Sequence, residues 1–494
     1  MNIVWFKKDL RAFDHAALAY SLEKGKTIGL FIFEPEWFTS VEFDQIHLKF
    51  VIESVSDLKN ALAIKKIPLI IRNQSALSTF EDLNRTHKVT SINSHQETGL
   101  QWTYDRDLKV KKWAEVNSIP WTEFKQFGVI RKLKNRETWT EKRKAIVNRK
   151  IIFVGGQPEI VSPWGTGNIP TDLLIGTDAL KNKNLQIGGR QKAMHTLQSF
   201  VNLRSENYSA SISSPIKAFK GCSRLSPYIT WGNLTLSEIE WATQQKKMEL
   251  EKFSNNSWWI KSIEQFESRL WWHCHFIQKL ETEPEIEFQN FNREFDGLRE
   301  NDFDESKFQA WCKGETGFPM IDACMKALLQ NGWINFRMRA MLLSFATYQL
   351  WLHWKRPAEF LARKFLDFEP GIHYSQVQMQ AGVTGINTIR IYSPKKQLLD
   401  QDPQGIFVKK YLPELENVSL SDLAEPHLMP PFLQIESGYK PGLTYPEPIV
   451  NPEKSYQIAK QKMFEWKKQP EVKKMSEKIL LKHVSRNKNF TIKT

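Results

Sequence analysis

The segment from Trp311 to Phe345, WCKGETGFPMIDACMKALLQNGWINFRMRAMLLSF, constrains the fold of this chain more than any other feature of its sequence. Two glycines precede Pro319, and proline favours the first turn of a helix. The apolar periodicity that follows predicts a helix closed by Gly332, and a second helix then carries Arg337 and Arg339 among apolar residues. Because a buried arginine is rare without a partner, the segment predicts either a bound polar ligand or a fixed ion pair.

Length and composition limit the class of protein. At 494 residues the chain exceeds a single hydrophobic core, which predicts two or three domains. No apolar run reaches the ~18 residues of a membrane span, and the first residues, MNIVWFKKDLR, predict a strand and not a signal peptide. Four cysteines in so long a chain indicate a reducing compartment. We therefore expect a cytoplasmic monomer without a membrane segment.

The positive charge of the chain is concentrated in two segments. The net charge is +14, and residues 125–150 and 451–494 each contribute +8, so the remainder is slightly acidic. Basic segments are typical of nucleic-acid-binding surfaces, and equally of solvated lysine-rich helices. Both interpretations stay open at this point.

Short apolar runs alternate with helical patterns over residues 1–125, which predicts a doubly wound parallel α/β domain. The predicted strands are Ile3–Phe6, Ile28–Phe33, Leu69–Ile71, Val89–Ile92 and Ile119–Phe124. The predicted helices are Ala16–Glu23, Phe50–Lys65, Ser75–His87 and Tyr104–Glu115. Residues 126–190 form a predicted connector rich in Gly and Pro, and residues 191–494 are expected to be all-helical. A single Lys-rich helix with a frayed end is predicted from Asn451 to Thr494.

Four further stretches extend the pattern of the opening segment. They are VWFKKDLRAFDHAAL (Val4–Leu18), GCSRLSPYITWG (Gly221–Gly232), TIRIYSP (Thr388–Pro394) and FVKKYLPEL (Phe407–Leu415). Together with the opening segment, they resemble the motifs of the cryptochrome/photolyase flavoproteins in the order of that family. The resemblance covers nearly the whole chain and implies an N-terminal antenna-type α/β domain and a C-terminal helical FAD-binding domain. Lys7 and His15 depart from the family pattern.

The resemblance implies where the FAD phosphates bind. Ser223 and Ser226 surround a predicted helix start, and the free N–H groups of such a start suit an anion, although an ordinary helix cap has the same pattern. By resemblance the phosphates are lined by Tyr208, Cys222, Ser223, Arg224, Leu225 and Ser226. Cys222 replaces the usual threonine, which removes one hydroxyl.

The flavin ring is assigned by resemblance to four further positions. Arg339 is expected to pair with Asp367 beside the ring, and Glu369 completes the same D-x-[DE] element; a packing ion pair is the alternative. His373 falls at the position that faces flavin N5, where photolyases usually carry asparagine. A histidine there could donate a proton or accept a hydrogen bond, or be purely structural.

The tryptophan relay through which this family usually reduces its flavin is interrupted. Trp354 stands at the middle position, but Val377 and Asn301 occupy the other two. Four other aromatic residues offer either another electron route or simple core packing: Trp351, Tyr348, Tyr374 and Tyr392.

The lesion-contacting positions are mixed. Trp272 matches a tryptophan that stacks on a flipped pyrimidine dimer, whereas Arg269 stands where a glutamate is usual and Met379 replaces a second tryptophan. Phe336 stands where Asn or His is usual, so the catalytic candidates form an apolar pocket able to accept an extruded base. His273 replaces an arginine and is assigned to the cofactor.

Metal chemistry is not predicted, and a second chromophore is an open alternative. His273 and His275 point about 200° apart on a helix and cannot share one ion. No cysteine follows Cys324, so an iron–sulfur cluster is not expected. The stretch His95-Gln96-Glu97-Thr98 follows the fourth predicted strand, where a parallel sheet binds ligands, and could hold a folate or deazaflavin antenna or none.

The leading hypothesis is a light-driven flavoprotein of the photolyase type, a lyase. Reduced, excited FAD would pass an electron to a pyrimidine lesion in damaged DNA, single-stranded DNA included. One alternative is a cryptochrome-like blue-light receptor without repair activity. Another is a flavin-bound DNA-binding protein without photochemistry.

Overall fold

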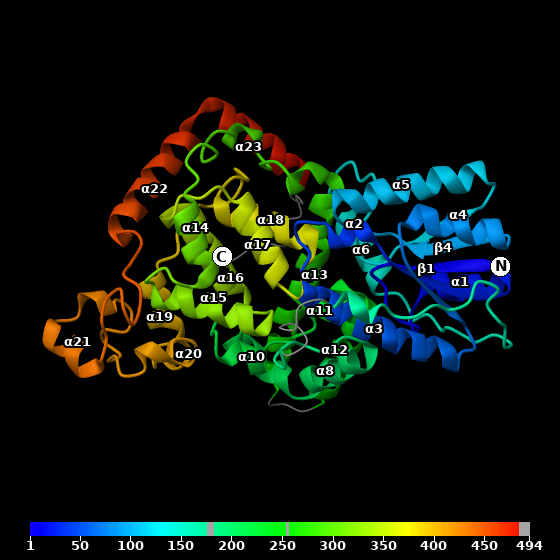
Figure 1. Ribbon diagram of the computed structural model, residues 1–494, viewed down its shortest axis with the longest axis horizontal. Coiled ribbons are helices and arrows are strands. Elements are labelled where there is room, and N and C mark those ends of the chain that lie inside the picture. Colours follow the sequence, from blue (N-terminus) through cyan, green and yellow to red (C-terminus); the bar gives the residue numbers. More distant parts are fainter. Residues whose placement is uncertain (175–181, 253–255, 484–494) are drawn as a thin grey trace.

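The computed structural model describes residues 1–174, 182–252 and 256–483. A parallel sheet with helices on both faces forms one end of the molecule, and a larger helical part forms the other (Figure 1). The strand order is β3-β2-β1-β4-β5. The strands are β1 (Asn2–Phe6), β2 (Thr27–Phe33), β3 (Leu69–Asn73), β4 (Ser91–His95) and β5 (Trp121–Phe124).

The sheet confirms the predicted doubly wound α/β architecture. Its central strands β1 and β2 are buried along their whole length, as expected for strands covered by helices on both faces. The covering helices are α1 (Ala16–Lys24), α2 (Pro35–Phe38), α3 (Gln45–Ile64), α4 (Ala76–Thr86) and α5 (Gln101–Val116). Helix α3 begins five residues before the predicted start because Asp44 caps it, accepting a hydrogen bond from the Ile46 amide.

The second part of the chain is helical, as predicted. Its first helices are α8 (Arg190–Asn202), α9 (Tyr208–Ser211), α10 (Lys217–Gly221), α11 (Ser226–Thr230), α12 (Leu236–Leu250) and α13 (Ser257–Thr282), while α6 (Trp139–Val147) lies within the predicted connector. They are followed by α14 (Glu305–Lys313), α15 (Pro319–Asn331), α16 (Phe336–Ser344), the π-helical turn η5 (Phe345–Gln349), α17 (Lys355–Lys364) and α18 (Pro370–Ala381). The last are α19 (Pro394–Gln401), α20 (Ile406–Tyr411), α21 (Pro431–Ser437), α22 (Pro452–Lys468) and α23 (Pro470–His483).

The C-terminal tail differs in part from the prediction made from the sequence. The predicted single C-terminal helix is two helices, α22 and α23, because Pro470 disfavours helical backbone at Gln469 and cannot donate an amide hydrogen bond. The predicted frayed end at residues 484–494 lies outside the described residues.

All four cysteines are free and buried, and no helix of the described ranges is long and apolar enough to cross a bilayer.

Candidate functional site

A buried ion pair joins α16 to the turn before α18. Arg339 Nη2 lies 3.0 Å from Asp367 Oδ2, and Arg339 Nε donates to the Ile334 carbonyl at 2.8 Å. Burial alone would raise the pKa of Asp367, but the charge and hydrogen bond of Arg339 outweigh it and hold that pKa below its ordinary value. Asp367 therefore stays ionised beside Arg339. The arginine of the apolar helix thus has an ion-pair partner, one of the two alternatives that the sequence predicted.

This pair forms part of the wall of a cavity of about 580 Å³. The cavity also brings together three other predicted site residues: Phe336, Glu369 and His373. Three buried oxygens of its lining have no hydrogen-bond partner among the described residues: Asp367 Oδ1, Glu369 Oε1 and Gln376 Oε1. Since buried polar atoms normally have a partner, the cavity is suited to a ligand that donates hydrogen bonds to these oxygens.

His373 lines the cavity as a neutral imidazole that can accept a hydrogen bond. Its Nε2 lies 2.9 Å from the Ala358 carbonyl oxygen, which can only accept, so Nε2 carries the proton and Nδ1 keeps its lone pair. Burial lowers the pKa of His373 to about 4. A neutral imidazole with a free Nδ1 accepts a hydrogen bond, as the oxygen of an asparagine amide does.

Exchanging His373 for asparagine is expected to reduce the acid sensitivity of folding. The folded pKa of about 4 lies below the ordinary value of 6.5, so between these values the unfolded chain binds a proton that the folded chain excludes. The wild type therefore loses about 1.4 kcal/mol per pH unit relative to His373→Asn as the pH falls through this window. Urea unfolding at pH 7, 6 and 5 measures the difference, and parallel pH curves for the two proteins would contradict it.

The residues predicted to bind phosphates surround the short helix α11. Leu225 at the start of α11 makes no side-chain cap, and Ser226 bonds to Asp367. Arg224 stacks on Trp333 at 3.9 Å, its Nη1 is buried without a partner, and burial lowers its pKa to about 10. The charges of Asp367 and Arg339 also influence the pKa of Arg224. The residues predicted to bind the phosphates are therefore near those predicted to face the ring.

Other members of this group have mainly apolar surroundings. Burial raises the pKa of the Cys222 thiol to about 12, so it is not a reactive thiolate. Tyr208 packs against Phe200 and Phe266. Ser223 accepts a weak hydrogen bond from the Leu225 amide at 3.4 Å.

Several predicted site residues lie outside the cavity wall. Arg269 stacks on Trp272 at 4.8 Å on α13, and His273 packs edge-on to Phe127 of the connector with both ring nitrogens unpaired. Met379 is half-buried on α18. Trp354 is fully buried and donates its indole N–H to Asn290 Oδ1 at 2.7 Å.

Sequence reasoning missed part of the cavity wall on α18. Ile372, Gln376 and Gln380 line the cavity together with His373. These three residues follow one another at intervals of four, which places them on one face of the helix. Once His373 was taken as a site residue, this spacing could have identified them in the sequence.

A second cavity lies at the carboxyl ends of β1 and β2, against the helical part. Three tryptophans contribute aromatic faces to its wall: Trp37, Trp102 and Trp231. Arg106 donates to Glu34 and to Glu97, each at 2.7 Å. Burial raises the pKa of Glu34 to about 7 despite the arginine, so this wall carries a carboxyl group that titrates near neutrality.

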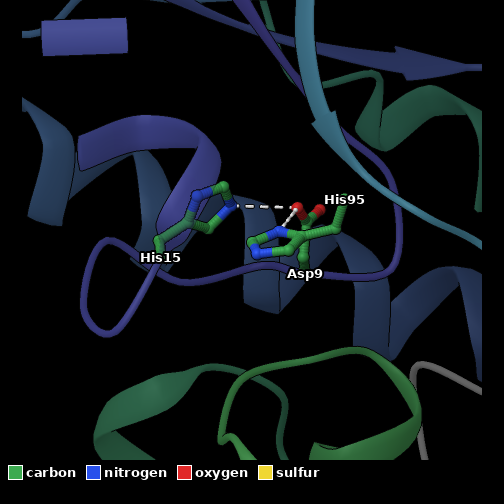
Figure 2. Close-up of side chains that lie close together, drawn as sticks. All are labelled: Asp9, His15 and His95. Atoms are coloured by element: carbon green, nitrogen blue, oxygen red, sulfur yellow. Dashed lines mark hydrogen bonds and ion pairs between the residues drawn. The ribbon is translucent and has the colours of Figure 1, made fainter. Parts of the chain in front are cut away.

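A polar cluster occupies the sheet edge where β1 and β4 are neighbours, the point at which strand order reverses (Figure 2). Asp9 Oδ2 accepts from His15 Nε2 at 2.9 Å and from His95 Nδ1 at 2.7 Å. His15 Nδ1 accepts the Leu18 amide proton at 3.0 Å, which places the His15 proton on Nε2. A metal-bound histidine needs the opposite arrangement, with its second nitrogen as a donor, so this cluster is a hydrogen-bonded tie between β1, α1 and β4.

Known proteins are similar to both parts of the chain. Residues 2–133 match the model described as DNA photolyase, and residues 266–465 match the FAD-binding domain of DNA photolyase. The chain is 25% identical over 449 residues to the deoxyribodipyrimidine photo-lyase of Vibrio cholerae, covering 87% of this chain and 94% of that relative. It is 26% identical over 484 residues to cryptochrome DASH of Gloeobacter violaceus, covering 91% and 93%.

Solved structures share the fold. A bacterial class III photolyase from Agrobacterium tumefaciens superposes with a TM-score of 0.82 at 22% identity, over 95% of this chain and 98% of that one. A cryptochrome from Synechocystis gives a TM-score of 0.81 at 22% identity, over 93% and 98%. With one family model on the α/β part and another on the helical part, the chain belongs to the cryptochrome/photolyase family of FAD flavoproteins.

Proposed function

We propose that this protein is a light-driven DNA photolyase that holds FAD in the cavity beside the Arg339–Asp367 pair. The observation that carries the proposal is the set of buried oxygens in that wall without protein partners. A reduced flavin ring carries N–H groups, which could donate hydrogen bonds to the oxygens of Asp367, Glu369 and Gln376. Reduced and excited by light, the bound flavin would supply one electron to a pyrimidine lesion and regain it after the lesion splits.

The side chains of this protein have separate tasks in the proposal. Asp367, Glu369 and Gln376 orient the ring edge, while Arg339 keeps Asp367 ionised. His373 accepts a hydrogen bond at Nδ1. Arg224, whose Nη1 is free, and the uncapped start of α11 hold the phosphates, together with Tyr208, Cys222, Ser223 and Ser226.

The lesion would enter at the exposed end of the cavity. Phe336 lines the cavity with about half of its surface exposed, and Ala340 beside it is small. An extruded base finds apolar faces there, with Trp272 and Met379 as further contacts and Arg269 beside Trp272. The lesion in damaged DNA, double- or single-stranded, is thus recognised by stacking more than by polar contacts. His273 keeps the cofactor role that the resemblance implies, and it packs against Phe127 outside the cavity wall.

Light-dependent repair by the full-length, FAD-loaded and chemically reduced protein tests the proposal. Dimer-containing single- and double-stranded DNA should regain thymine absorbance in light and not in darkness. An Arg356→Leu variant, altered at a surface ion pair, should repair at the wild-type rate. Full flavin occupancy with no repair in light would refute the photolyase function and favour the cryptochrome-like receptor, whose relatives the chain also matches.

A second chromophore of the folate or deazaflavin type is proposed for the second cavity, between the sheet and the helical part. The tryptophans of its wall suit a flat heteroaromatic ring, and Glu34 and Glu97 can accept its N–H groups. Loading the FAD-containing protein with each chromophore should give excitation transfer to flavin that weakens in Trp102→Ala. Absence of binding by both chromophores would leave FAD as the only light absorber of the proposal.

A further inference from the structure

The four aromatic residues that could replace the interrupted relay differ sharply in their surroundings. A side chain donates an electron more easily when no cation lies on its ring and when a base can take the proton it releases. These two conditions can be checked residue by residue from contacts within the described part of the chain.

Two of the four candidates lie under cations. The guanidinium of Arg299 lies 4.6 Å from the Trp351 ring, and Lys462 Nζ lies 4.7 Å from the same ring. Arg299 also lies 5.3 Å from the Tyr348 ring, whose buried hydroxyl has no partner among the described residues. A positive charge opposes the formation of a second one, so both residues are poor donors.

Tyr374 has the opposite surroundings. Its ring is almost fully buried, and its hydroxyl donates to Glu42 Oε1 at 2.5 Å, across 332 residues of sequence. Burial raises the pKa of Glu42, which makes its carboxylate a better base than an exposed one. Tyr392, the fourth candidate, is only partly buried at the edge of the core and has no carboxylate bonded to its hydroxyl.

Tyr374 is also close to the flavin cavity. Its ring centroid lies 5.4 Å from that of His373 and 6.5 Å from that of Phe368, and both of these side chains line the cavity. Trp354, which keeps the middle relay position, lies 6.4 Å from Tyr374. The indole N–H of Trp354 donates to the amide oxygen of Asn290, which is not a base, so an oxidised Trp354 would keep its proton.

We propose that Tyr374 and Glu42 form the electron-donor site of this protein and replace the interrupted tryptophan relay. Tyr374 would give one electron, directly or through Trp354, to light-excited oxidised flavin bound in the cavity. The phenolic O–H bond of Tyr374 breaks, its proton moves to the carboxylate of Glu42, and a neutral tyrosyl radical remains. The electron is now on the flavin and the proton is on Glu42, so charge and atoms balance. The inference rests on the proposed binding of FAD.

Three variants of the FAD-loaded full-length protein test this assignment. Tyr374→Phe keeps the ring but removes the hydroxyl, Glu42→Gln keeps an acceptor but removes the base, and Tyr348→Phe is the matched control at a buried hydroxyl without a partner. After a light flash, electron paramagnetic resonance should detect a tyrosyl radical in the wild type and in Tyr348→Phe. The signal should be lost in Tyr374→Phe and fall about tenfold or more in Glu42→Gln, the scale of losing a charged hydrogen-bond partner.

The assignment would be overturned by a tyrosyl signal that survives Tyr374→Phe, or by a wild-type radical yield in Glu42→Gln. The wild type in D₂O needs no variant, and a radical that forms at the same rate there as in H₂O would also overturn it. A purely structural Tyr374–Glu42 bond predicts none of these radical changes.

A measurement without flavin checks the bonded pair itself. In the apoprotein labelled with ¹³Cζ-tyrosine, Glu42→Gln should shift one tyrosine resonance, the one absent from Tyr374→Phe. If no resonance shifts, the bond and the proposal fail.

Failure of the photolyase function is separate, because chemically reduced protein does not use this donor. Repair without a tyrosyl radical would remove only the donor assignment, whereas a chain that binds no FAD would remove the proposed function.

Discussion

Replacing Asp322 with alanine is expected to lower the free energy of unfolding by about 4 kcal/mol, a large part of the stability of a typical domain. Asp322 is fully buried in α15, and each of its oxygens accepts two hydrogen bonds. Oδ1 accepts from the Thr316 amide at 2.9 Å and the Thr316 hydroxyl at 2.6 Å. Oδ2 accepts from the Gly317 amide at 3.0 Å and the Tyr445 hydroxyl at 2.6 Å. Alanine would leave these donors without their acceptor.

The backbone around Asp322 leaves little room for another arrangement. Gly317 has φ +77°, and a Cβ atom there would lie 2.4 Å from the backbone of Glu447. The loop before α15 therefore touches the segment that leads to α22, and Asp322 ties both together. Because the loop cannot move away to find other partners, the loss should be near the full cost of unpaired buried donors.

Urea unfolding measures this prediction, with Asp304→Ala as the matched control. Asp304 caps α14 at the surface, accepting from the Lys307 amide at 3.0 Å, and its loss should cost about 1 kcal/mol. A cost for Asp322→Ala no greater than that for Asp304→Ala would show that the buried network contributes no more than one surface cap.

Replacing Arg339 with leucine is expected to destabilise the fold by about 3 kcal/mol and to abolish retention of FAD through purification. The variant leaves the Asp367 carboxylate, whose side chain is 5% exposed, without its cation in the core. Asp367 would then take up a proton or draw in water, and either change alters the wall that faces the ring. Stability is measured by urea unfolding and FAD retention by flavin absorbance per protein.

Arg356→Leu is the control for this second prediction. The Arg356–Glu305 pair joins two half-exposed side chains, so its loss should change stability far less than the loss of Arg339 and leave FAD content unchanged. Equal FAD content in Arg339→Leu and Arg356→Leu would make the Arg339–Asp367 contact a packing ion pair without a ligand role.

The local features of the fold were predictable from sequence because they depend on near neighbours. The strands of the sheet are short apolar runs between helical patterns, and their order along the chain predicts parallel pairing. The ends of elements were less predictable: α3 starts where Asp44 caps it, and the tail divides at Pro470. Motifs pointed to part of the wall of the proposed flavin cavity, including Arg339, Asp367 and His373. They did not point to Ile372, Gln376 and Gln380 of α18, which have no motif of their own.

The protonation states of the site could not be predicted in the same way. His373 was located by its distance from Asp367 in the sequence, yet its tautomer depends on the Ala358 carbonyl of another helix. Likewise, His15 departs from a motif, but only its bonds to Asp9 and Leu18 decide that its lone pair is unavailable to a metal.

The sequence by itself determined the family, the two-part architecture and the interruption of the tryptophan relay, because these follow from motifs and periodicities within short stretches. Only the tertiary structure decided which aromatic residue can replace that relay. In the sequence, Tyr374 and Trp351 are both aromatic residues, and nothing near them in the chain separates them as electron donors. In the structure, Tyr374 bonds to Glu42, which lies far away in the sequence, whereas Trp351 packs under Arg299 and Lys462. Charge and proton acceptance act over a few ångströms in space, whatever the separation along the chain.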